Sequence, residues 1–271
     1  MRHFDTQEER LAFLIEELCR DSGRYPDLVI PKGYTEKRNL MRSLMNVRIP
    51  GPISEEYLQV QDQFLQQEAR EKGIVPVSRL ASVKEEFGCG LPGAERMILW
   101  KGDITTLAAD AIVNAANSQL LGCFVPCHGC IDNAIHSAAG LQLREECGRI
   151  MKEQGYREPV GAAKITNGYN LPCKYVINTV GPIITDGLTD GDCRLLAGCY
   201  ESCMALAAEK GIKSIAFCCI STGEYRFPQD IAADIAVETV SRFLSGNSKL
   251  DTVIFNVFKE NDYKLYQNLF S

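Results

Sequence analysis

From residue 96 onward, short apolar runs alternate with longer segments of helical period, and this alternation constrains the fold more than any other feature of the chain. The run Ser-Ile-Ala-Phe-Cys-Cys-Ile at 214–220 is almost wholly apolar, which is typical of a strand buried on both faces. We predict strands at 97–101, 111–114, 163–167, 175–180, 214–219 and 252–258, and helices at 131–139, 141–154, 192–210, 231–244 and 261–270. The pattern predicts a central sheet covered by helices on both faces, a three-layer α/β/α fold.

Residues 1–85 have a different pattern, with helical periods at 6–19, 35–47 and 54–72 and no chemical motif. Thr6 and Ser54 are placed as N-caps, and Glu9 follows Thr6 at the spacing of a capping box. We therefore predict a helical N-terminal extension, residues 1–85, packed on a main domain, residues 86–271.

Composition excludes several classes of function. The 271 residues carry a net charge of −6 with no run of Lys and Arg, so we expect no nucleic-acid partner. No apolar run reaches the roughly 18–20 residues that span a bilayer, so we expect no membrane partner. The N-terminus is polar and acidic, unlike a signal peptide, and we expect a cytoplasmic monomer.

Twelve cysteines without an export signal indicate reduced, buried thiols and one metal cluster rather than disulfides. Cys123, Cys127, His128 and Cys130 fall within eight residues, and thiolate and imidazole are the ligands that zinc prefers. Because neighbouring side chains in an extended loop point apart, we expect Cys127 to lie outside the cluster. We predict Zn²⁺ on Cys123, His128 and Cys130, with the open position of a catalytic site; a structural zinc and coincident free cysteines are the alternatives.

Two further polar residues follow this cluster. Asp132 begins a predicted helix, where it either caps the helix or acts as an acid, base or orienting group. His136 lies on the same helix, and we expect a buried histidine that supports the site rather than a metal ligand.

Three loops follow predicted strands and should meet at one edge of the sheet. Asp103, after the first strand, either presents a carboxylate to a cleft or caps a helix; Asn114 and Asn117, after the second, suit sugar hydroxyls or form a turn. The loop Ser221-Thr222-Gly223-Glu224-Tyr225 follows the most apolar strand. It either offers amides to a diphosphate, with Tyr225 or Phe227 stacking on a ring, or is an ordinary connection.

Taken together, these motifs resemble a macrodomain, the fold that binds ADP-ribose. The resemblance covers about residues 96–258 and rests on Gly102-Asp103-Ile104-Thr105, Val113-Asn114-Ala115-Ala116-Asn117, the segment 131–140, Thr179-Val180-Gly181-Pro182 and Ile220-Ser221-Thr222-Gly223. It is closest to the MacroD-type branch, which carries a run of glycines where this chain has residues 123–130. That replacement and the helical extension resemble the zinc-dependent macrodomains of bacteria. The implied fold is a three-layer macrodomain with a central mixed sheet.

The resemblance also implies roles for individual residues. Asp103 and Ile104 would contact adenine, and Ser221, Thr222, Gly223, Glu224 and Tyr225 would surround the diphosphate, with Tyr225 near the distal ribose. Asp132 and Asn117 would be the catalytic-site residues at that ribose, beside the zinc on Cys123, His128 and Cys130. Asn178 stands where many relatives have histidine, so no role is carried over to it.

The implied activity is hydrolysis of mono-ADP-ribose from modified proteins, with Zn²⁺ as cofactor, and ADP-ribose and mono-ADP-ribosylated protein as ligands. Two other functions remain open at this point. One is an ADP-ribose-binding module with structural zinc, and the other is an O-acetyl-ADP-ribose deacetylase.

Overall fold

A twisted six-stranded sheet forms the centre of the molecule. The computed structural model describes residues 4–23, 28–246 and 249–271. The strand order is β2 (Met97–Lys101), β8 (Thr252–Val257), β7 (Ser214–Phe217), β4 (Ala111–Ala115), β6 (Tyr175–Thr179), β5 (Ala163–Asn167). Neighbouring strands are parallel except β5, which is antiparallel to β6, so the sheet is mixed as predicted.

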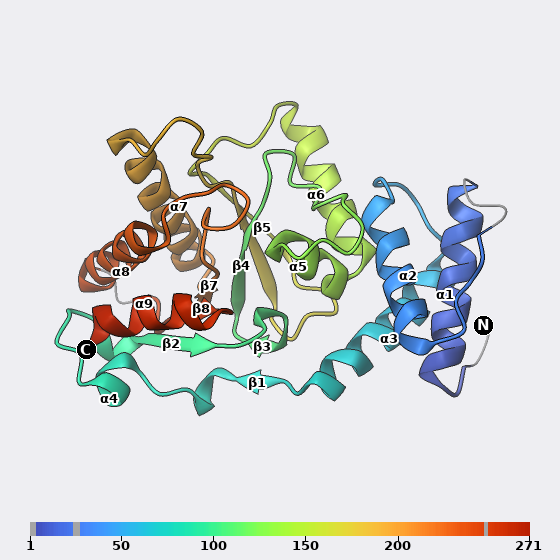
Figure 1. Cartoon of the computed structure of the whole chain (residues 1–271), viewed down its shortest axis with the longest axis horizontal. Coiled ribbons are helices and arrows are strands. Elements are labelled where there is room, and N and C mark those ends of the chain that lie inside the picture. The colour runs from blue at the N-terminus through green and yellow to red at the C-terminus, as the bar shows by residue number, and fades with distance from the viewer. Residues whose placement is uncertain (1–3, 24–27, 247–248) are drawn as a thin grey trace.

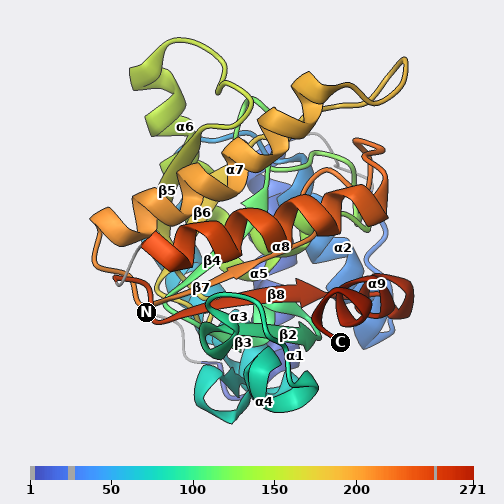
Figure 2. The same ribbon diagram turned by 90° about the vertical axis from the view of Figure 1, so that its left-hand side faces the viewer.

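Helices cover both faces of this sheet, which confirms the three-layer α/β/α fold. On one side lie α7 (Asp190–Glu209), α8 (Gln229–Gly246) and α9 (Glu260–Phe270), and on the other α5 (Ile131–Ala139) and α6 (Leu141–Gln154) (Figures 1 and 2). The side chains of the central strands are buried on both faces, which is why β4 and β8 carry almost no charged residue.

The N-terminal extension is helical, as predicted, and lies outside the α5 and α6 layer (Figure 1). Its helices are α1 (Gln7–Ser22), α2 (Tyr34–Val47) and α3 (Glu55–Lys72), which share a separate apolar core. The Thr6 hydroxyl accepts a hydrogen bond from the Glu9 amide and the Glu9 carboxylate accepts one from the Thr6 amide, so the capping box forms. Ser54 caps α3 by accepting from the amide of Tyr57.

Several short elements were not predicted, because two to five residues are too few to show a period. β1 (Val75–Pro76) pairs with β3 (Leu107–Ala108) in a small parallel ladder, and α4 (Val83–Phe87) packs below β2. Turns of 3-10 helix occupy Val77–Arg79, Ala94–Arg96 and Ile104–Thr106. The boundary at residue 85 stays a prediction; Val83 already belongs to the larger core.

All twelve cysteines are free, as predicted, and most of those in apolar segments are buried. No helix within the described residues has the length and apolarity needed to cross a membrane.

Candidate active site and metal centre

A cavity of about 660 Å³ opens where the parallel strands end. It collects the loops after β2, β4, β6, β7 and β8, as expected for a ligand site of an open parallel sheet. The residues to which the macrodomain resemblance gives a role all line it: Asp103, Ile104, Asn117, Cys123, His128, Cys130, Asp132, Ser221, Thr222, Gly223, Glu224 and Tyr225. Asn114, which was also considered for sugar hydroxyls, is fully buried and does not line it. The predicted convergence of the three loops is therefore confirmed.

Asp103 lines the cavity and also stabilises the turn that carries it. Its Oδ1 accepts from the amide of Thr105 at 3.0 Å and from the Thr105 hydroxyl at 2.7 Å, so it caps the short 3-10 helix Ile104–Thr106. Both bonds use the same oxygen, and no donor within the described residues reaches Oδ2. The capping and the cleft interpretations are thus compatible, because Oδ2 can accept from a ligand.

Sequence reasoning missed the residues that β8 and its following loop bring to this cavity. They include Asn256, Phe258, Lys259 and Asp262. The Phe258 side chain is 75% exposed, although it follows a buried strand directly, and an exposed ring on the cavity wall can stack on a flat ligand. An aromatic residue at the end of an apolar strand was the available signal, but the prediction included Phe258 in the strand itself.

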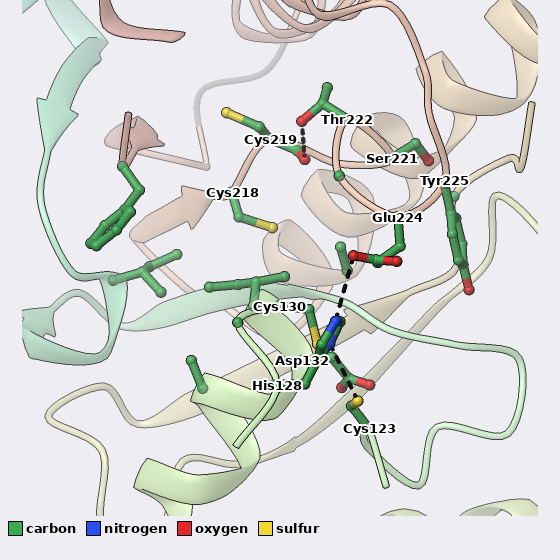
Figure 3. A pocket seen from close by; sticks show the side chains of 18 of the residues that line it. Cys123, His128, Cys130, Asp132, Cys218, Cys219, Ser221, Thr222, Glu224 and Tyr225 are labelled. Atoms are coloured by element: carbon green, nitrogen blue, oxygen red, sulfur yellow. Dashed lines mark hydrogen bonds and ion pairs between the residues drawn. The ribbon is translucent and has the colours of Figure 1, made fainter. Parts of the chain in front are cut away.

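The loop Ser221–Tyr225 forms the wall opposite the metal ligands (Figure 3). Ser221 has a positive φ of 65°, and the amides of Gly223, Glu224 and Tyr225 donate to no protein atom within the described residues. Three successive unbonded amides at a cavity wall are suited to bind an anion such as a diphosphate.

One alternative for this loop is wrong. Phe227, considered as a stacking residue, is only 2% exposed and belongs to the core, because its amide turns back to bond the carbonyl of Ser221. Tyr225 does line the cavity.

Asp132 is 5% exposed and lies at the floor of the cavity, in the first turn of α5. It does not cap this helix; Cys130 is the N-cap, and its Sγ accepts from the amide of Asn133. Asp132 instead accepts from Asn114 Nδ2 at 2.8 Å and from Asn117 Nδ2 at 3.3 Å. Burial raises the pKa of Asp132 to about 6, although the bonds from the two asparagines oppose the shift.

The asparagines around Asp132 form a chain into the sheet. Asn114 on β4 also donates to Asn178 Oδ1 on β6 at 3.0 Å, so Asn178 has a structural partner within the sheet. Asn117 also donates to the carbonyl of Gly122, which joins it to the loop that carries the metal ligands. Asn117 thus orients both Asp132 and this loop.

His136 lies beside the same carboxylate, one turn further along α5, with no hydrogen-bond partner on either ring nitrogen within the described residues. It is 4% exposed, and its Nε2 lies 3.5 Å from Asp132 Oδ1. Burial lowers the pKa of His136 to about 3, so the ring is neutral at physiological pH. The histidine lies outside the metal cluster, in agreement with the prediction that it is not a ligand.

Cys123, His128 and Cys130 form the metal cluster, with all three ligand atoms within 4.8 Å of one another. Cys123 Sγ lies 3.6 Å from His128 Nδ1, and a tetrahedral zinc separates bound sulfur and nitrogen atoms by about 3.6 Å. The donor set and its spacing therefore fit zinc. Figure 3 shows these ligands gathered beside Asp132.

Cys127 points away from the cluster. Its φ of 51° reverses the backbone, and its Sγ lies 3.2 Å from Ser43 Oγ and 3.3 Å from the carbonyl of Asn39, both on α2. The three ligands predicted from the sequence are thus the three that the structure brings together.

The other ring nitrogen of His128 faces the opposite wall. His128 Nε2 lies 3.5 Å from Glu224 Oε1, as the dashed line in Figure 3 shows. With Nδ1 directed to the metal cluster, this carboxylate lies on the side from which acidic neighbours commonly orient metal-bound histidines.

Comparison with known proteins agrees with this geometry. The Macro domain family matches residues 113–236. A protein-ADP-ribose hydrolase of Treponema medium is 54% identical and aligns over 98% of this chain and all of its own length. A protein-ADP-ribose hydrolase of Staphylococcus aureus is 45% identical over 100% of this chain and 98% of its own.

Solved macrodomain structures also resemble this chain. The Trypanosoma brucei macrodomain in complex with ADP-ribose superposes with a TM-score of 0.65 at 30% identity, covering 85% of this chain and 95% of its own. A mutant Oceanobacillus iheyensis macrodomain with ADPR has a TM-score of 0.59 at 39% identity, covering 64% and 90%. With the strand order, the cavity and relatives aligned along its whole length, the chain belongs to the macrodomain family, in the group that includes these bacterial protein-ADP-ribose hydrolases.

Proposed function

We propose that this protein removes mono-ADP-ribose from modified proteins, and that Zn²⁺ on Cys123, His128 and Cys130 takes part in the reaction. The bond broken joins C1″ of the distal ribose to a protein side chain, which we infer to be a carboxylate ester. Water supplies the oxygen to C1″, and the side chain leaves as a carboxylate with release of a proton.

The single observation that carries this proposal is that the metal cluster and the residues expected to hold ADP-ribose lie in one cavity. The metal ligands and the buried Asp132 line the same cavity as Asp103 and the Ser221–Tyr225 loop. Binding of ADP-ribose alone does not require a buried carboxylate beside a metal cluster with an open position, whereas hydrolysis can use both.

Different parts of the cavity then bind different parts of ADP-ribose. Asp103 Oδ2 accepts from the adenine amino group with Ile104 beside the base, and the amides of 223–225 bind the diphosphate. This binding leaves the distal ribose between Tyr225, Asn117 and Asp132.

In this arrangement Asp132 acts on the reacting carbon from the floor of the cavity. Ribose C1″ gains positive charge as its bond breaks, and a carboxylate positioned by Asn114 and Asn117 stabilises that charge without having to reorganise. When bound, zinc supplies Lewis acidity toward a ribose hydroxyl or water. Glu224, next to His128 Nε2, helps to orient this ligand.

The decisive experiment separates catalytic from structural zinc. His128→Ala should abolish release of ADP-ribose from mono-ADP-ribosylated protein while the fold and most of the ADP-ribose affinity remain, because the adenine and diphosphate contacts do not involve the metal. Zinc content by elemental analysis, melting temperature and turnover are measured on the same samples.

Cys127→Ala is the matched control, since its thiol faces α2, and it should keep both zinc and turnover. A sharp fall in the melting temperature of His128→Ala, with activity falling only in step with folded protein, would instead make the zinc structural. Turnover of O-acetyl-ADP-ribose in preference to modified protein would favour the deacetylase function.

A further inference from the structure

The loop that carries the metal ligands has little structure of its own. Residues 122–130 contain neither helix nor strand, and their one internal backbone bond within the described structure runs from the His128 amide to the Val125 carbonyl. The tip of the loop, from Val125 to Cys127, is exposed. The positions of the three ligands therefore depend on contacts from outside the loop.

Helix α2 of the N-terminal extension supplies many of these contacts from a single face. Asn39, Arg42, Ser43 and Asn46 are spaced at i, i+3, i+4 and i+7, so they lie along one stripe of the helix. The apolar side chains of α2, such as Met41 and Leu44, instead pack in the core of the extension. The polar stripe is thus directed at the metal-binding loop.

Arg42 makes the most specific contact. Its Nη2 donates to the carbonyl of His128 at 3.0 Å, so it bonds the backbone of a metal ligand. Its Nε and Nη2 also donate to Asn133 Oδ1 at 3.0 and 2.6 Å. Asn133 in turn donates to the carbonyl of Val125 at 2.9 Å. One guanidinium therefore braces the loop directly and through α5.

Asn46 fixes the middle of the loop. Its Oδ1 accepts from the amide of Cys127 at 2.9 Å, and its Nδ2 donates to Ser137 Oγ on α5 at 3.1 Å. Asn46 is 1% exposed, so these bonds do not compete with water.

Arg144 on α6 connects the end of α2 to the first metal ligand. Its Nη1 donates to the carbonyls of Met45, Asn46 and Arg48, where the dipole of α2 is negative. Its Nη2 donates to the carbonyl of Cys123 at 3.3 Å. Burial lowers the pKa of Arg144 only to about 10, so it remains a cation at neutral pH.

We propose that α2 is a positioning element of the metal centre, and that Arg42 holds His128 where it can share one zinc with Cys123 and Cys130. Arg42 does not touch the substrate; it acts by fixing the backbone of a ligand. This inference rests on the proposed function, because it assumes that these three residues bind zinc. It gives the extension a role in the chemistry of the cavity.

Arg38 offers a matched control on the same helix. It lies one turn before Arg42 and pairs with Glu68 on α3 at 2.6 and 2.7 Å, away from the loop. Arg38→Met and Arg42→Met each remove one guanidinium from α2, but only Arg42→Met removes contacts to the metal-binding loop.

The test measures zinc affinity of the full-length chain by competition with a chromophoric chelator at fixed pH. Arg42→Met should bind zinc about 10–100-fold more weakly than wild type, the usual effect of losing a group that orients a metal ligand. Arg42→Lys should recover only part of this loss, because an ammonium cannot reproduce the fork that bonds two acceptors. Arg38→Met should keep the wild-type zinc affinity, and all variants should keep their affinity for ADP-ribose, which shows that the domain is folded.

Wild-type zinc affinity in Arg42→Met, or equal losses in Arg38→Met and Arg42→Met, would overturn the proposal. If the wild-type chain binds no zinc, the proposed function fails instead, and hydrogen exchange of metal-free protein then tests the positioning role. Faster exchange at the amides of 127 and 128 in Arg42→Met supports it, and unchanged exchange refutes it.

Discussion

At the scale of single residues, the site contains side chains that stabilise the local fold and also line the cavity. Asp103 caps a turn with one oxygen and keeps the other for the cavity, and Asn117 braces both Asp132 and the carbonyl of Gly122. Interpretations that competed in the sequence are therefore compatible at these positions.

Asp103→Ala should weaken ADP-ribose binding by about 1–3 kcal/mol, because it removes a charged hydrogen-bond acceptor. Thr105→Val is the control, since it removes a bond to Asp103 Oδ1 and leaves the carboxylate in place. Calorimetry on both variants checks the role, and unchanged affinity in Asp103→Ala would exclude an adenine contact.

At the scale of elements, the positions of loops on the sheet were predictable, but side-chain directions within the loops were often not. Parallel strands bring their carboxyl ends to one edge, so the convergence of Asp103, Asn117 and Ser221 followed from the position of each loop directly after a strand of one sheet. Phe227 could not be assigned, because the positive φ of Ser221 and Arg226 redirects the chain and has no signal in the sequence. The contacts of Arg42 were also hidden, since 86 residues separate it from His128.

Two of the converging loops touch at Gly181. A Cβ there would lie 2.0 Å from Ser221 Oγ and 2.9 Å from Ile220 Cγ2, so only glycine allows this approach. Gly181→Ala should lower the free energy of unfolding by about 1–3 kcal/mol, the usual result of overpacking, and should weaken ADP-ribose binding by displacing the amides of 223–225.

A double-mutant cycle in urea checks this contact. Adding Ser221→Ala to Gly181→Ala should restore part of the stability, because the closest atom is removed. Gly223→Ala, whose Cβ would meet nothing within 4 Å, should leave the free energy of unfolding nearly unchanged. If the changes in the free energy of unfolding were strictly additive, Gly181 and Ser221 would not be in steric contact.

At the scale of the whole molecule, His136 ties stability to pH. Its pKa is about 3 in the folded protein and near 6.5 when unfolded, so the unfolded state binds the proton first as the pH falls. The part of the free energy of unfolding that depends on neutral His136 is therefore complete above about pH 6.5. It is lost progressively between about pH 6.5 and 3, and the loss amounts to about 2 kcal/mol at pH 5.

Urea unfolding of metal-free protein at pH 7 and pH 5 measures this effect. Wild type should lose about 2 kcal/mol more than His136→Phe between these two pH values, since other groups titrate in both proteins and cancel in the difference. An equal loss in the two proteins would mean that His136 is protonated in the fold.

The metal ligands and the residues that would recognise ADP-ribose are distributed along the chain in opposite ways. Cavity residues range from Gly102 to Asp262 and include the ends of five strands or the loops after them, whereas the three ligands lie within eight consecutive positions, 123–130. Substitutions that alter recognition are therefore dispersed over the fold, whereas those that remove the three proposed metal ligands all fall in one short segment. The cavity can thus lose its metal ligands and keep the rest of its lining.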